Sequence, residues 1–160
     1  MVSRQLSLFV GHIMLSILLV GVASASYPMF HHDEQRTGYV PEEGPQTNAT
    51  LWVAETAEFA EGSPAVHNGK VFIPTWPDMD FAETNPMGLV CYDAATGAEL
   101  WTNELGGDGI GSVSGVAVAD GRIYLGGTDG RLYCIDEATG ETLWASDRID
   151  ATGYFGLSSS

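Results

Sequence analysis

The sequence predicts an all-β fold assembled from repeated four-stranded antiparallel units. Twenty glycines and seven prolines in 160 residues, with no triplet period, indicate many tight turns. The segment 89–101 recurs 43 residues later as 132–144, with the same Leu, Cys, Asp, Ala, Thr, Gly and Trp positions. Apolar residues make up 44% of the chain and charged residues 17%, which favours a packed core. Four short strands in about 43 residues are the unit of a β-propeller blade or of an antiparallel solenoid.

The first 25 residues have the pattern of a secretory signal peptide. Arg4 supplies a positive charge, residues 6–22 are mostly apolar, and Ala23-Ser24-Ala25 matches the small residues before a cleavage site. The longest unbroken apolar run, 13–22, is ten residues long, and a membrane-spanning helix needs about 20. We therefore expect cleavage after Ala25 and a secreted or extracytoplasmic protein, in the periplasm or at the cell surface, with no membrane span.

Internal similarity divides the remaining chain. The segment 47–52 matches 96–101, which marks a partial copy ahead of the two full ones, and the first full copy carries an insertion around residues 77–85. The predicted organisation is a lead-in at 26–46, a partial blade at 47–60, full blades at 61–105 and 112–148, and the start of another blade at 156–160. We expect a fragment of a longer propeller, in which 47–52 supplies the outer strand of the last blade and closes the ring.

Turn chemistry places the strands within each copy. Asn68-Gly69 and Asp120-Gly121 each stand between β-rich runs, which is a strong hairpin signal because both central residues need a positive φ. The segments 93–97 and 136–140 have the pattern Asp-x-x-Thr-Gly, in which the carboxylate can accept hydrogen bonds from turn amides. The glycine supplies the left-handed residue that ends each turn.

These turns, each followed four residues later by a tryptophan, resemble the tryptophan-docking motif of quinoprotein-type β-propellers, also called pyrroloquinoline-quinone-like repeats. The resemblance implies that the tryptophan of one blade packs against the turn of its neighbour, a structural role. An indole also buries a large apolar area, and its N–H can reach a turn carbonyl. The residues concerned are Asp93, Thr96, Gly97, Trp101, Asp136, Thr139, Gly140, Trp144 and, in the partial copy, Trp52. Cys91 and Cys134 stand where the family usually has alanine, and we expect no disulfide between them.

Charge and residue spacing limit the chemistry that we expect. Six Lys and Arg residues against 21 Asp and Glu give a net charge of −15, which argues against a nucleic-acid partner. His31-His32-Asp33-Glu34 is interpreted as a polar surface segment, because neighbouring side chains on a strand point to opposite faces. The acidic stretch 77–83 lacks the ligand spacing of a calcium loop, so we interpret it as a solvated acidic loop, with a weak Ca²⁺ site as the alternative. It is the best candidate for a binding loop. Asn48 begins a glycosylation sequon.

The resemblance also extends to quinone-dependent dehydrogenases. Such enzymes would require an adjacent Cys-Cys pair and a Glu/Asn/Asp set for calcium, and neither pattern is found in the sequence. We therefore predict no catalytic, cofactor-binding or metal-binding residue, and no cofactor; calcium or pyrroloquinoline quinone is expected only if the full-length protein is an enzyme. We predict a non-enzymatic, secreted or surface propeller segment that binds or scaffolds proteins. Its expected partners are other propeller blades or other proteins. The alternative is the N-terminal part of a dehydrogenase that depends on pyrroloquinoline quinone and calcium. A third hypothesis, glycan binding, has Trp76 and Phe81 as candidate residues.

Overall fold

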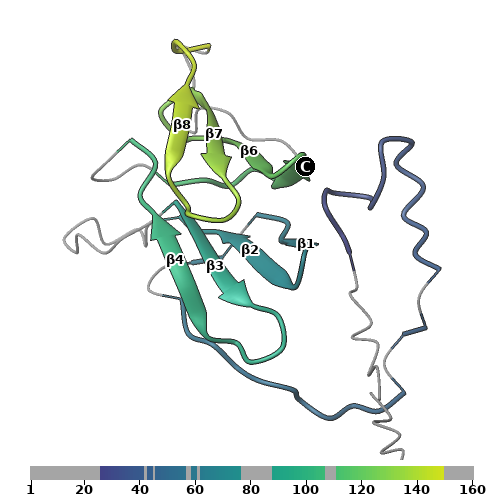
Figure 1. The fold of residues 1–160 in the computed structure, drawn as a ribbon. Coiled ribbons are helices and arrows are strands. Elements are labelled where there is room, and N and C mark those ends of the chain that lie inside the picture. Colours follow the sequence, from purple (N-terminus) through teal and green to yellow (C-terminus); the bar gives the residue numbers. More distant parts are fainter. Residues whose placement is uncertain are drawn as a thin grey trace, which may run out of the picture.

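The computed structural model describes residues 26–41, 43–44, 46–56, 59–60, 62–76, 88–106 and 111–149. These residues form eight strands in two four-stranded antiparallel sheets and contain no helix. The sheets lie one above the other in Figure 1, and the all-β prediction is confirmed. The predicted signal peptide, the acidic stretch 77–83 and the run-in at 156–160 lie outside the described residues. No helix in the described part of the chain is long and apolar enough to cross a membrane.

The first sheet, which we call blade 1, follows chain order. It consists of β1 (Ala65–His67), β2 (Lys70–Pro74), β3 (Leu89–Asp93) and β4 (Glu99–Asn103), and each strand pairs with the next. The hairpin between β1 and β2 turns at Asn68 and Gly69, whose φ angles are 48° and 72°. This is the positive-φ pair that the sequence predicts for a two-residue turn.

The second sheet, blade 2, repeats this plan. Its strands are β5 (Ala117–Ala119), β6 (Arg122–Gly126), β7 (Leu132–Asp136) and β8 (Thr142–Ala145). Asp120 and Gly121 take φ angles of 51° and 71° in the first hairpin. The third and fourth strands shift register at equivalent places in the two blades, next to Cys91 and Cys134. The sequence repeat is therefore also a repeat of backbone geometry.

The core lies between the two blades. β3 is buried at four successive positions because both of its faces are covered, so its sequence shows no apolar–polar alternation. The core cluster comprises Ala65, Phe72, Leu89, Cys91, Val116, Val118, Ile123, Leu125, Tyr133 and Ile135. At its edge, buried Ser112 donates from its backbone N–H to the Thr75 carbonyl and from Oγ to the Gly126 carbonyl, both at 2.8 Å. The first bond joins the segment before blade 2 to the residue that follows β2, and the second joins that segment to the end of β6.

The lead-in forms backbone hydrogen bonds with the first strand of each blade, β1 and β5. Tyr27 exchanges two backbone hydrogen bonds with Val66 of β1. The carbonyl of the next residue, Pro28, accepts from Val118 N–H of β5 at 2.8 Å. The chain then turns at His31 and His32, which have positive φ angles rather than the extended backbone of a strand. Residues 46–56 run without forming a strand, so the predicted ring closure through 47–52 stays a prediction.

Candidate functional site between the blades

Two Asp-x-x-Thr-Gly turns form the acceptor side of the candidate site. Asp93 Oδ1 accepts hydrogen bonds from Ala95 N–H at 3.0 Å and from the N–H and Oγ1 of Thr96, each at 2.8 Å. Gly97 then takes a φ of 72°. The carboxylate therefore closes the turn between β3 and β4, and the glycine lets the chain leave it.

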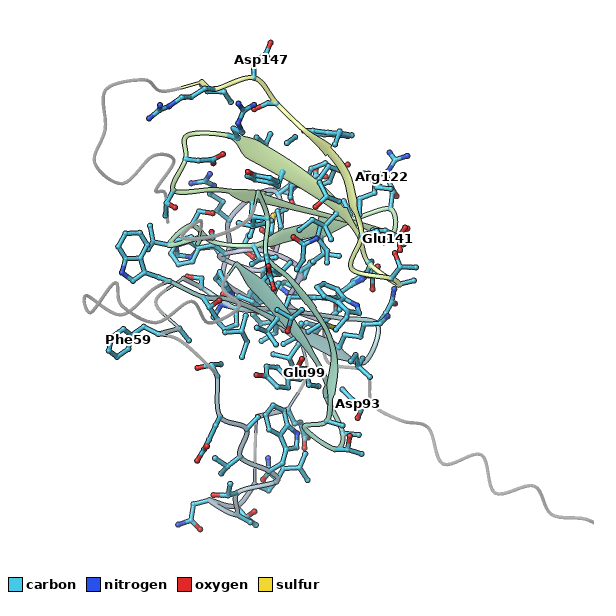
Figure 2. All side chains as sticks on the ribbon, turned by 90° about the vertical axis from the view of Figure 1, so that its left-hand side faces the viewer. Phe59, Asp93, Glu99, Arg122, Glu141 and Asp147 are labelled. Atoms are coloured by element: carbon cyan, nitrogen blue, oxygen red, sulfur yellow. The ribbon has the colours of Figure 1, made fainter. Side chains whose placement is uncertain are left out.

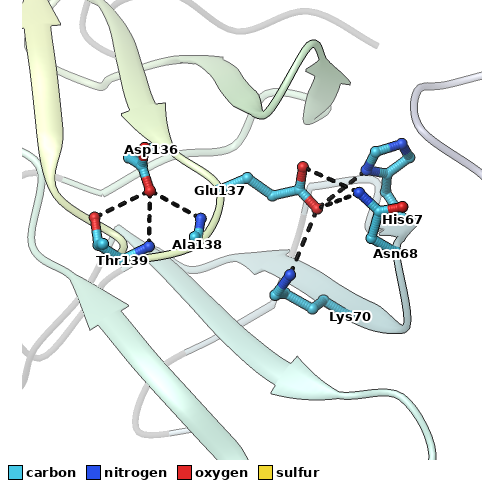
Figure 3. A network of polar contacts seen from close by, with 7 residues as sticks. All are labelled: His67, Asn68, Lys70, Asp136, Glu137, Ala138 and Thr139. Atoms are coloured by element: carbon cyan, nitrogen blue, oxygen red, sulfur yellow. Dashed lines mark hydrogen bonds and ion pairs between the residues drawn. The ribbon is translucent and has the colours of Figure 1, made fainter.

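The turn between β7 and β8 has the same construction. Asp136 Oδ1 accepts from Ala138 N–H at 2.9 Å and from Thr139 N–H and Oγ1 at 2.8 and 3.1 Å (Figure 3). Gly140 has a φ of 75°. Both turns lie on one side of the molecule, where Figure 2 labels Asp93 and Glu141.

Trp52, from the extended segment before blade 1, covers the first turn. Its indole Nε1 donates to the Ala94 carbonyl at 2.9 Å, and its ring stacks near Tyr92 with centroids 6.4 Å apart. A Cβ placed on Gly97 would lie 2.6 Å from Trp52 Cδ2. Glycine is thus required here for two reasons: the positive φ and the close approach of the indole.

Trp101, on β4 of blade 1, covers the turn of blade 2. A Cβ on Gly140 would lie 2.5 Å from Trp101 Cδ2, so the two indoles sit on their turns in nearly the same way. The indole nitrogen of Trp101, however, is buried and finds no hydrogen-bond partner within the described residues. Asn103 bonds the turn instead, because its Nδ2 donates to the Gly140 carbonyl at 2.6 Å and to Thr142 Oγ1 at 3.0 Å.

A buried carboxylate adds a second contact between the blades. Glu137, which is 4% exposed, follows Asp136 in the blade 2 turn and faces the first hairpin of blade 1 (Figure 3). Its Oε1 lies 3.1 Å from His67 Nδ1, 3.2 Å from Asn68 Nδ2 and 3.6 Å from Lys70 Nζ. One anionic group is therefore held by an imidazole, an amide and an ammonium from the neighbouring sheet. We call Glu137, His67, Asn68 and Lys70 the interblade cluster.

Trp144, the third tryptophan of the repeat, covers no turn of the described chain. It stands on β8 opposite Cys134, as Trp101 stands on β4 opposite Cys91. Its side chain is 45% exposed, and the adjacent Leu143 is 48% exposed. The structure therefore brings two of the three repeat tryptophans onto turns and leaves the third open.

The electrostatics of the turn aspartates follow from their bonds. The side-chain and backbone hydrogen bonds from Thr96 hold the pKa of Asp93 below its ordinary value. The backbone and side-chain bonds from Thr139 do the same for the pKa of Asp136. Both groups are thus held as carboxylates, which is the form that accepts several donors.

The remaining predicted features stay apart from this site. Cys91 and Cys134 are free and buried, and burial raises the pKa of the Cys91 thiol to about 12. Asn48 is exposed. Asp33 closes its own turn by accepting from Thr37. Within the described ranges no three His, Cys, Asp or Glu side chains gather as metal ligands.

The sequence interpretation missed the interblade cluster and Asn103. The repeat carries one signal that could have pointed to the cluster: Glu137 replaces Ala94 in an otherwise similar turn, and Lys70 is the single lysine of the chain. Which residues Glu137 meets depends on how the two sheets are placed, since His67 is 70 positions away.

Comparison with known proteins gives matches along most of the chain. A family model described as "Outer membrane protein assembly factor BamB" and built on pyrroloquinoline-quinone (PQQ) repeats matches residues 36–160. The dehydrogenase subunit of the quinone alcohol dehydrogenase of Gluconobacter oxydans (strain 621H) is 32% identical over 110 residues, which are 64% of this chain and 13% of that protein. The 1-butanol dehydrogenase (cytochrome c) of Thauera butanivorans is 31% identical over 104 residues, 59% of this chain and 14% of that protein.

Among solved structures, the quinohemoprotein alcohol dehydrogenase from Comamonas testosteroni aligns with a TM-score of 0.59. The alignment covers 83% of this chain and 21% of that chain at 22% identity, and it supports the fold. The predicted all-β, partial propeller architecture is thereby confirmed. The chain spans 13 to 14% of the length of the two curated relatives described above.

Proposed function

The chain belongs to the family of PQQ-type β-propeller repeats, and we propose that it is a non-enzymatic propeller segment that binds or scaffolds proteins. The observation that carries the proposal is the distribution of its polar and apolar groups. The polar side chains that the structure brings together around Asp93 and Asp136 close their own turns, and those around Glu137 join blade 2 to blade 1. Apolar side chains are left exposed.

The two most exposed large apolar side chains of the described residues lie on an anchored segment. Leu51 and Val53 are 78% and 82% exposed on either side of Trp52, which is fixed to the blade 1 turn. Phe59, farther along, is 53% exposed and points away from the sheets (Figure 2). Exposed apolar side chains that are held in place, and are not on a loose tail, are characteristic of a surface that a protein partner covers.

We place this function outside the cytoplasm. The proposal rests on the signal-peptide pattern of residues 1–25, with cleavage expected after Ala25. The measurement is N-terminal sequencing of the exported chain, and a mature chain that still begins at Met1 would contradict it.

A second candidate function is favoured by the curated relatives. Both are dehydrogenases, at 31 and 32% identity, and the first is named as quinone-dependent. The chain would then be one part of the wall of such an enzyme. The residues described here do not by themselves fit a quinone and calcium site, because no three acidic, histidine or cysteine side chains gather among them and the two cysteines lie on different sheets.

One experiment separates the two candidates. A photoreactive residue is placed at Val53 of the exported chain, and at Glu99, an exposed polar position on β4, as the control (Figure 2). We expect a defined protein adduct from position 53 and none from position 99. The same preparation is incubated with pyrroloquinoline quinone and Ca²⁺ and assayed for alcohol-dependent dye reduction. Dye reduction without an adduct would favour the dehydrogenase segment.

A further inference from the structure

The interblade cluster contains a residue pair that is prone to a spontaneous chemical change. Asn68 precedes Gly69 in the hairpin between β1 and β2, and both residues are exposed. In such a pair the glycine backbone nitrogen can attack the side-chain amide carbon of the asparagine. A cyclic imide forms, ammonia leaves with the proton of the glycine N–H, and water then opens the ring to aspartate or isoaspartate. Glycine favours the attack because it has no Cβ to hinder it.

The other three asparagines of the sequence are poorer sites for this reaction. Asn48 is exposed, but the methyl group of the alanine that follows it hinders the attack. Asn103 is 9% exposed, and its amide donates to the Gly140 carbonyl. Asn85 precedes a proline, which has no N–H to react. Asn68 is therefore the position at which the reaction is expected first.

The amide of Asn68 faces a buried carboxylate in the fold. Its Nδ2 lies 3.2 Å from Oε1 and 3.5 Å from Oε2 of Glu137, which is 4% exposed (Figure 3). Conversion to aspartate replaces this donor with a second anion. His67 and Lys70, which lie 3.1 and 3.6 Å from the same Oε1, then serve two carboxylates instead of one. Like charges repel strongly where little water screens them.

Blade 2 shows that the hairpin backbone itself accepts an aspartate. Asp120 and Gly121 form the equivalent turn, with φ angles of 51° and 71° against 48° and 72° in blade 1. Asp120 is exposed. An aspartate at position 68 would therefore fit its turn, and its cost would come from the Glu137 carboxylate.

We propose that Asn68 is a deamidation site whose conversion irreversibly loosens blade 1 from blade 2. The reaction removes the amide nitrogen that the hydrogen bond to Glu137 holds. Conversion is therefore slow while the blades are packed and proceeds when their contact opens. Each conversion weakens the contact that slowed it, so the interblade cluster limits its own lifetime. The proposal holds whether the whole protein is a scaffold or a dehydrogenase.

The first experiment follows the reaction in the whole chain. The protein is kept in mildly alkaline buffer made with heavy-oxygen water, and peptide mass spectrometry locates the incorporated label. We expect label at Asn68 before Asn48 or Asn103. Asp120→Asn places the same residue pair in the exposed hairpin of blade 2, without a facing glutamate. Position 120 of that variant should react about tenfold faster than position 68, because a hydrogen bond to a charged group protects only the latter. Earlier label at Asn48, or equal rates at positions 68 and 120, would overturn the proposal.

The second experiment introduces the product directly and does not depend on the reaction rate. Asn68→Asp should lower the urea midpoint of the whole chain. Asn68→Asp combined with Glu137→Gln exchanges the amide and the carboxylate, so that one anion again faces Lys70, and it should restore most of the loss. A midpoint unchanged by Asn68→Asp would overturn the proposal. A combined variant as unstable as Asn68→Asp would overturn it too, because the loss would then not come from the facing carboxylates.

Discussion

The contacts made by Trp52 and Trp101 use one design with different polar bonds. Both indoles lie on an Asp-x-x-Thr-Gly turn and leave no room for a Cβ on its glycine. Trp52 donates a hydrogen bond to its turn at 2.9 Å, whereas the Trp101 nitrogen has no such partner in the described chain. At the Trp101 contact, Asn103 and Glu137 make the polar bonds instead. The close packing of an indole on the turn glycine is therefore common to both contacts, whereas the hydrogen bonds that accompany it differ.

The two contacts also differ in what stands behind the tryptophan. Trp101 belongs to a paired strand of blade 1 and packs against the buried Phe72 ring. Trp52 belongs to the segment 46–56, which pairs with no strand of the described chain, and Tyr92 Oη donates one hydrogen bond to its Glu55 carbonyl at 3.3 Å. Disturbing the Trp101 contact therefore strains both sheets, whereas disturbing the Trp52 contact releases only the segment 46–56.

The largest expected effect comes from Gly140→Ala. The left-handed φ costs about 1–2 kcal/mol, and pressing the new Cβ into the Trp101 ring adds about 1–3 kcal/mol, because the sheet behind that ring cannot move away. We expect the free energy of unfolding in urea to fall by about 3 kcal/mol. Gly121→Ala is the matched control, since it has a φ of 71° but open space around it, and it should lose about 1 kcal/mol. Gly97→Ala tests the comparison itself, because the Trp52 segment can swing away and the loss should lie between these two. Equal losses for Gly140→Ala and Gly121→Ala would show that the ring contact contributes nothing.

The next effect is that of the interblade cluster. Glu137→Ala removes the acceptor of Asn68 and the anion beside Lys70 in a nearly dry position. We expect the free energy of unfolding to fall by about 2 kcal/mol. Glu141→Ala, at an exposed carboxylate just after the same turn, should change it by less than about 0.5 kcal/mol. A similar loss in both variants, measured in urea, would contradict a specific role for the cluster.

Acid should weaken both turns. The pKa values of Asp93 and Asp136 are lowered in the fold by their hydrogen bonds, from an ordinary value of 3.8. Their stabilisation is therefore complete above the unfolded pKa and is lost as the pH falls through the lower folded pKa. We expect the unfolding temperature to drop below about pH 4, and Asp136→Asn to reduce that drop. The control is Asp120→Asn, in an exposed hairpin, which should leave the acid profile as it is.

The smallest expected effect compares the two cysteines. Cys91 pairs across strands with Trp101, whose indole lies on the turn 136–140, whereas Cys134 pairs with the exposed Trp144. Both thiols are buried, so alkylation of the native chain should be slow at each. Local opening should expose Cys134 more often, and we expect it to react faster with iodoacetamide in a mass-spectrometric time course. Faster reaction at Cys91 would mean that the Trp101 contact opens more readily than the edge at β8.

Local chemistry explains why much of the fold is predictable from the sequence. The Asn68-Gly69 and Asp120-Gly121 hairpins need positive φ angles, which few other residue pairs tolerate, and the structure has them. The partners of Glu137 were not predictable, because they depend on how two sheets pack together. That the Trp101 nitrogen has no hydrogen-bond partner among the described residues was unexpected as well. An indole N–H within reach of a turn carbonyl is a local expectation, and the tertiary placement of the ring decides whether it forms.

The backbone bonds from Tyr27 and Pro28 to the two blades have a consequence for the order of folding. Tyr27 can pair with β1 once residue 66 has been synthesised, but the Pro28 carbonyl waits for Val118, about 90 residues farther along the chain. Closing so long a loop is entropically costly and slow compared with forming hairpins whose strands are neighbours in sequence. The two sheets can therefore collapse first, and the beginning of the chain is fastened across them afterwards. We therefore expect the lead-in, which is synthesised before both sheets, to be among the last segments to reach its final position.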